Sequence, residues 1–225
     1  MQRLLGGSAS PAGWWVSYLQ APFDQVVAAV WHGTVRRRRW WQRGLPPYPA
    51  CLEALEPFTV PVTRYLVVGC GETWTALIDN NALGGEPSIA GPVAAVLPGV
   101  LGVTALHSPR RGPGHGGTQL RVARHGDAPS QVQERSLCAD CADGRWSWYE
   151  DGDPLPFERP ELYRARLIKQ RFNRAILIEY LSALGIRADD DAFYGGPVAM
   201  VDLPRFGREV VRSRQEALDW LEVHD

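Results

Sequence analysis

The sequence predicts a single α+β domain, in which hairpins build an antiparallel sheet and helices pack at both chain ends. Strand-like apolar segments are joined by short turns in the middle of the chain, and helical spacing occurs near both ends. The 225 residues contain no repeat and no interdomain linker, and the 45% of hydrophobic residues can bury a substantial core. We therefore treat residues 1–225 as one domain and expect residues 1–12 to be flexible.

The expected helices are marked by apolar spacing and by residues typical of helix ends. They cover residues 23–31, 50–56, 160–184 and 213–223. Asn173 is expected to divide the third of these into two helices, and Gly185 to end it. Ser213 and Glu216 have the spacing of a capping box at the start of the last one.

The expected strands include two hairpins, each with its own turn signal. The strands cover residues 65–68 and 74–78, 118–126, 135–141 and 145–150, and 198–201. Glycines separate the first pair, and Asp143-Gly144, a typical two-residue hairpin turn, separates the second. Residues 93–106 are expected to form a short helix and then a strand, and residues 108–117 a loop.

Composition limits the class of protein. The formal net charge of −1, from 24 basic and 25 acidic residues, argues against a protein that coats nucleic acid, although a local patch can still bind it. No apolar run approaches the roughly 20 residues that span a bilayer, and the first residues lack the apolar core of a signal peptide. We expect a cytoplasmic protein with no membrane partner. Lys169 is the only lysine, and we attribute the preference for arginine to codon bias.

A glycine-rich turn raises the question of a cofactor. The run "LVVGCG" ends at Gly69, Cys70 and Gly71 and resembles the first motif of methyltransferases that use S-adenosylmethionine. A dinucleotide site needs a third spaced glycine and a following helix. Here the next residues alternate as a strand does and end in turn-forming residues. We therefore interpret the glycines as a hairpin turn and expect no cofactor.

The strand after this turn carries a second resemblance. The segment "WTALIDN", with Trp74, Asp79 and Asn80 followed by Gly84, resembles a tryptophan-rich strand in bacterial immunity-type proteins of unknown function. This resemblance implies a binding protein encoded beside a toxin, with Asp79 and Asn80 as candidate binding residues. From the residues alone, Trp74 is expected in the core and Asp79-Asn80 in a turn.

Cys138 and Cys141 have the two-residue spacing of a zinc knuckle or a redox pair. A zinc site needs four ligands and there is no second cysteine pair, although His107, His115 and His125 are near in sequence. We interpret the spacing as coincidence and keep both cysteines as weak metal candidates.

The segment at residues 36–43 is the strongest candidate contact surface. Its candidate binding residues are Arg36, Arg37, Arg38, Arg39, Trp40, Trp41 and Arg43. Arginine and tryptophan together bind phosphate, stack on bases or hold an acidic protein surface. Equally, the arginines can stabilise the end of the preceding helix while the tryptophans pack inward. Further basic residues within 164–174 are interpreted as the solvent-facing side of a helix.

No nucleophile, zinc-protease or P-loop motif occurs, so we do not expect an enzyme. The sequence favours a non-enzymatic cytoplasmic protein-binding module of the immunity or antitoxin type, which masks a partner protein. Two alternatives remain: an enzyme that acts on nucleic acid or a nucleotide with residues from distant segments, and a nucleic-acid-binding module that uses residues 36–43.

Overall fold

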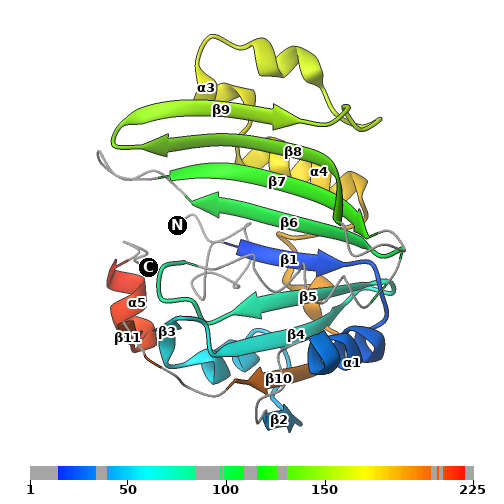
Figure 1. Cartoon of the computed structure of the whole chain (residues 1–225), viewed down its shortest axis with the longest axis vertical. Helices are drawn as coiled ribbons and strands as arrows, with labels where there is room; N and C mark the ends of the chain where they lie inside the picture. Colours follow the sequence, from blue (N-terminus) through cyan, green and yellow to red (C-terminus); the bar gives the residue numbers. More distant parts are fainter. Residues whose placement is uncertain are drawn as a thin grey trace.

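The computed structural model describes residues 15–33, 40–84, 97, 99–108, 116–125, 131–203, 207 and 210–220. Within these residues the chain forms a nine-stranded antiparallel sheet in the order β2-β10-β4-β5-β1-β6-β7-β8-β9, and a two-stranded sheet of β11 and β3 (Figure 1). The predicted α+β class is confirmed.

The bounds of the strands and helices are as follows. The strands are β1 (Trp15–Leu19), β2 (Trp40–Arg43), β3 (Phe58–Val60), β4 (Arg64–Cys70), β5 (Trp74–Asp79), β6 (Leu101–Ser108), β7 (Gly116–His125), β8 (Gln131–Ala142), β9 (Arg145–Asp151), β10 (Val198–Asp202) and β11 (Val210–Arg212). The α-helices are α1 (Phe23–Gly33), α3 (Ile168–Arg171), α4 (Arg174–Ala183) and α5 (Arg214–Trp220), and the 3₁₀ helices are η2 (Ala50–Leu55), η4 (Pro160–Arg164) and η5 (Asp191–Tyr194).

Both predicted hairpins are confirmed. β4 pairs with β5 and β8 pairs with β9, each in antiparallel register. Gly71 has a φ of 55° between β4 and β5. Asp143 and Gly144 have φ values of 49° and 78°, as a two-residue hairpin turn with positive φ at both central positions requires.

The centre of the sheet comes from the start of the chain. β1 lies between β5 and β6, with Ser17 opposite Leu77 on one side and opposite Thr104 on the other. No strand was predicted here from the sequence. Five residues are too few to show a clear alternation, and the partners of β1 lie far along the chain.

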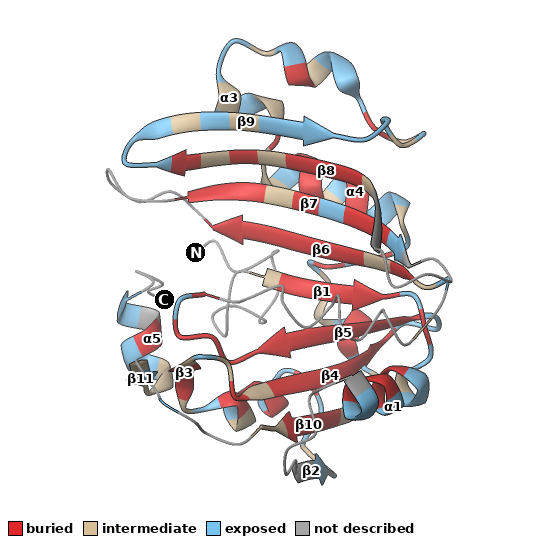
Figure 2. Ribbon diagram, in the orientation of Figure 1, coloured by how far each residue is buried: buried red, intermediate tan, exposed pale blue. Residues whose placement is uncertain are grey.

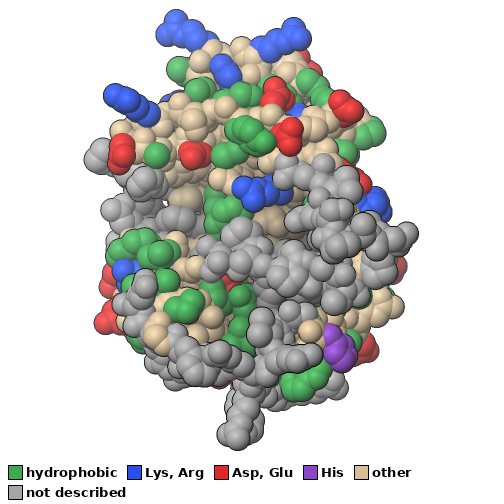
Figure 3. All heavy atoms as spheres, viewed as in Figure 1, with side chains coloured by type: hydrophobic (Ala, Val, Ile, Leu, Met, Phe, Trp, Pro, Cys, Tyr) green, Lys and Arg blue, Asp and Glu red, His purple; other side chains and the backbone are tan. Residues whose placement is uncertain are grey.

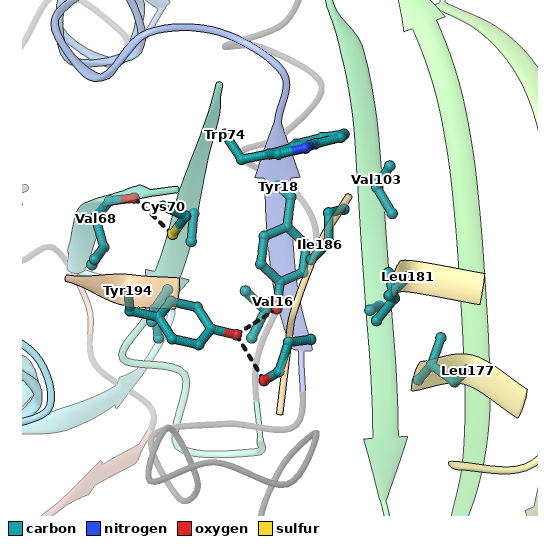
Figure 4. Packing of buried hydrophobic residues seen from close by; sticks show 14 of the residues in the cluster. Val16, Tyr18, Val68, Cys70, Trp74, Val103, Leu177, Leu181, Ile186 and Tyr194 are labelled. Carbon is teal, nitrogen blue, oxygen red and sulfur yellow. Dashed lines mark hydrogen bonds between the residues drawn. The ribbon is translucent and has the colours of Figure 1, made fainter. Parts of the chain in front are cut away.

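The two faces of the sheet bury separate cores. α1 covers β4, β5 and β10 on one face, with Val26, Val30 and Val67 fully buried there. On the other face η2, α4 and η5 pack over the middle of the sheet, where Leu177 and Leu181 of α4 contribute to the larger core (Figure 4). β1, β4, β5 and β6 are buried along most of their length, whereas β9 is largely exposed (Figure 2).

Trp74 belongs to this larger core, as predicted, and only 4% of its surface is exposed. Near it the Tyr18 and Tyr194 hydroxyls lie 2.8 Å apart, and the Tyr194 hydroxyl also donates to the Ala188 carbonyl at 3.0 Å. Burial raises the pKa of both tyrosines far above the ordinary value. Both phenols are therefore neutral parts of the core.

The predicted helix over residues 160–184 is broken more often than expected. Asn173 does divide it, because its Oδ1 accepts hydrogen bonds from the amides of Ala175 and Ile176 and so caps α4. Gly185 follows the end of α4 with a φ of 83°. The first half, however, consists of η4 and a single turn, α3, because the chain leaves the helical conformation at Ala165 and is extended at Leu167.

The ends of the chain match the prediction in part. α5 begins with the predicted capping box, in which the Ser213 amide donates to Glu216 Oε2 and the Glu216 amide donates to Ser213 Oγ. The main helical cover, however, comes from the segment between β9 and β10 rather than from α1 and α5. Packing of helices at both chain ends thus stays a prediction.

Candidate functional site

Half of the arginine-tryptophan segment, residues 36–43, lacks a described structure. Arg36, Arg37, Arg38 and Arg39 lie outside the described residues. The backbone of Trp40, Trp41 and Arg43 forms β2, an edge strand that pairs with β10. β2 was not predicted as a strand. The binding role of these seven residues stays a prediction.

Asp79 and Asn80 lie inside the protein. Asn80 is fully buried, and its Oδ1 accepts hydrogen bonds from the amides of Thr63 and Arg64, each at 2.9 Å. Its Nδ2 donates to the Pro57 carbonyl at 2.7 Å and to Thr63 Oγ1 at 3.0 Å. Asp79 Oδ1 accepts from the Asn81 amide at 2.8 Å. These bonds fix the turn after β5, as the residue types predicted; a binding role for the pair remains a prediction.

Cys138 and Cys141 both lie in β8, three residues apart. Successive side chains of a strand point to opposite faces, so the two thiols lie on opposite sides of the sheet. Burial, followed by the nearby Asp140, raises the pKa of Cys138 to about 11. No three His, Cys, Asp or Glu side chains of the described ranges form a group that could hold a metal ion. The structure therefore does not bring this pair together.

A different site lies at the β9 edge of the sheet. Trp146, Arg166, Leu167, Ile168 and Lys169 line a cleft of about 380 Å³, which we call the cationic cleft. This volume lies near the lower end of the range for small ligand sites. Arg166, Leu167 and Lys169 are exposed, so the cleft is open to solvent.

The alternation of β9 places the indole in the cleft. Trp146 and Trp148 are half-buried, while Arg145, Ser147 and Tyr149 on the opposite face are exposed. Trp148 packs against Tyr163 of η4, with ring centroids 5.2 Å apart. Ile168 also packs on the larger core, so one side of the cleft is held by the fold itself.

Positive charge dominates the other side. Arg166 and Lys169 line the cleft, and no acidic residue occurs in the sequence between Glu161 and Glu179. Neither Arg166 nor Lys169 forms an ion pair with any residue that the structure describes. Figure 3 shows basic side chains at the end of the molecule above β9, where η4 and α3 lie in Figure 1. From the sequence, these residues were expected on the solvent-facing side of a helix.

A buried ion pair holds the segment that leads to the cleft. Arg135 of β8 is 1% exposed, and its Nε and Nη2 donate to Glu158 Oε1 and Oε2 at 3.0 and 2.9 Å. Arg135 Nη1 also donates to the Gly152 carbonyl at 2.6 Å, and the Tyr163 hydroxyl donates to Glu158 Oε2 at 2.7 Å. Together these bonds attach residues 152–163 to β8. Burial, then hydrogen bonds with Tyr180 and Glu158, raise the pKa of Tyr163 well above its ordinary value.

Sequence reasoning missed this network. Arg135 and Glu158 are 23 residues apart, a distance that no strand or helix period links. Glu150, which lies in the predicted strand β9, also pairs with Arg135 at 3.1 Å.

No helix within the described ranges is both long and apolar enough to cross a membrane. Comparisons of the chain with protein-family models, with curated proteins and with solved structures found no match, so the cationic cleft is interpreted from its own chemistry.

Proposed function

We propose that this chain is a non-enzymatic binding module that holds an acidic segment of a partner protein in the cationic cleft. The observation that carries the proposal is the combination, in one open cleft, of an indole, two aliphatic side chains and two cations that pair with no described acidic residue. Tryptophan and arginine are the residues most enriched where binding energy concentrates at protein interfaces. A carboxylate beside an apolar side chain complements both parts of such a cleft.

The surrounding charges favour a protein segment over a nucleic acid. β9 and the residues after it carry the exposed carboxylates Glu150, Asp151 and Asp153. A long phosphate backbone needs cations along its whole track and would be repelled by these carboxylates. A short acidic segment is confined to the cleft and avoids them.

The proposal includes a finer assignment. The resemblance of residues 74–84 to immunity-type proteins supports a module that masks its partner. We further infer a cytoplasmic location, as expected from the sequence. The residues that line the cleft are far along the chain from residues 74–84. The chemistry of the cleft and the resemblance therefore support the proposal independently of each other.

Selection of short random peptides on the immobilised protein tests the proposed function. We expect enrichment of peptides in which Asp or Glu stands next to an aromatic or aliphatic residue. The double variant Arg166→Gln/Lys169→Gln should bind the enriched peptides about tenfold more weakly, which corresponds to about 1.4 kcal/mol. Fluorescence anisotropy with labelled peptide measures both affinities.

The matched control is Arg121→Gln/Arg187→Gln, which removes the same charge from exposed positions outside the cleft. This control should bind as the wild type does. Equal losses in both double variants would show that only overall charge matters, and the cleft would then not be the site. Tighter binding to a labelled single-stranded oligonucleotide, with a steep dependence on salt, would instead favour the nucleic-acid alternative.

A further inference from the structure

A second group of basic side chains lies beneath the sheet, away from the cationic cleft. His107 of β6 points to the same face as Val103 and Ala105, which belong to the larger core. Its Nδ1 lies 3.0 Å from Thr118 Oγ1 on β7. Its Nε2 is buried and has no hydrogen-bond partner within the part of the chain that the structure describes. Only 9% of the residue is exposed, so solvent does not readily satisfy this nitrogen.

Arg174 is the first residue of α4, the helix whose Leu177 and Leu181 pack in the same core as Val103 of β6 (Figure 4). Burial, and then the positive charge of Arg174, lower the pKa of His107 to about 4. Arg174 Nε is also buried and has no hydrogen-bond partner among the residues described, although the residue as a whole is partly exposed. The amides of Ala175 and Ile176 are already capped by Asn173 and contribute no free donor.

Each of these two basic groups thus has one buried nitrogen without a hydrogen-bond partner among the described residues. Buried polar nitrogens in native proteins nearly always have a partner. When the Thr118 hydroxyl donates to Nδ1, the proton of the neutral imidazole lies on Nε2, and the imidazolium carries it in any case. Two N–H donors beside a positive charge match an acceptor that is itself negative and has at least two oxygens.

We propose that a small oxyanion, a phosphate or a carboxylate group, binds between His107 and Arg174. The partly exposed Arg174 provides the route from solvent. The site involves β6, β7 and α4, and neither His107 nor Arg174 lines the cationic cleft, so this proposal stands whether or not the proposed function does.

The test follows the His107 imidazole by NMR during a pH titration, with inorganic phosphate, acetate or chloride at equal ionic strength. His107→Gln identifies the resonance. A bound anion favours the imidazolium, so phosphate should raise the pKa of His107 from its low value by at least about one unit relative to chloride. An equal effect of acetate would identify a carboxylate as a ligand class, and a smaller one would favour phosphate.

Arg174→Gln separates binding from general ionic effects. Loss of the arginine charge should raise the pKa of His107 in chloride, but phosphate should then add no further shift. The control Arg187→Gln should keep the full response to phosphate. The proposal is overturned if phosphate and chloride give the same titration in the wild type, or if the phosphate shift survives in Arg174→Gln.

Stability gives an independent readout. Phosphate should raise the melting temperature of the wild type more at pH 5 than at pH 7, because the protonated histidine binds the anion more tightly. The same rise in His107→Gln would contradict the site.

Discussion

Replacing Arg135 by methionine is expected to lower the free energy of unfolding by about 3–5 kcal/mol. The substitution removes the cation from a bidentate pair and leaves the Glu158 carboxylate, whose side chain is fully buried, without a counter-ion. It also removes the donor to the Gly152 carbonyl and so loosens residues 152–163. Urea denaturation measures the loss as a lower midpoint at an unchanged slope.

Arg159→Met is the matched control for this change. Arg159 pairs with Glu179 at 2.6 Å, but both side chains are about half exposed. Exposed pairs contribute about 0–1 kcal/mol, so this variant should unfold close to the wild type. The double variant Arg135→Met/Glu158→Leu should recover much of the loss, because no buried charge remains. If Arg135→Met and Arg159→Met cost the same, the buried pair does not hold the segment.

The second large effect is expected at Trp74. Trp74→Ala should cost about 3–5 kcal/mol, because the removed indole leaves a cavity in the larger core. The indole lies near Val103 and Tyr18 (Figure 4), and a Cβ at Gly185 would lie 3.5 Å from its Nε1. The residues around the indole belong to β1, β6 and the chain just after α4. Movement of one element alone therefore cannot fill the cavity.

Trp220→Ala provides the comparison for Trp74. Trp220 is 50% exposed, and its main described contact is the Arg212 guanidinium, 4.2 Å above the ring centroid. A contact of this kind at an exposed site contributes about 0.5–1 kcal/mol. A loss of less than about 1 kcal/mol for Trp74→Ala would show that the hairpin does not anchor the core. Chemical denaturation followed by circular dichroism avoids the change in tryptophan fluorescence.

The parts of the fold that could be predicted are those encoded by neighbouring residues. The Asp143-Gly144 turn needs positive φ at two positions, and only a few residue types accept that conformation. Asn173 and Ser213 indicate the N-termini of helices, because their side chains accept hydrogen bonds from backbone amides two or three residues later. In each case, the residues that indicate the turn or helix end are within a few residues of it in the sequence.

The rest depends on residues that meet only in the folded protein. β2 is a strand because β10 lies beside it, and no strand was predicted from its sequence. Trp146 and Lys169 belong to different elements, so the cationic cleft has no local sequence pattern. His107 was noted as a metal candidate, but its actual neighbours, Thr118 and Arg174, follow from the β6–β7 register and the position of α4.

The central position of β1 has a consequence for how the protein assembles during synthesis. β1 leaves the ribosome first among the described strands, yet it pairs at Ser17 with residues 77 and 104. Ala199 of β10 pairs with Val67 of β4, so the pairing of these two strands can form only after nearly the whole chain has been synthesised. The consecutive strands β6 to β9, in contrast, need only short loops to pair. We therefore expect the β6–β9 ladder and the β4–β5 hairpin to form as early units, with β1 joining them late. Until then its apolar side chains are exposed, and a nascent chain of this protein depends on rapid completion or on chaperone cover.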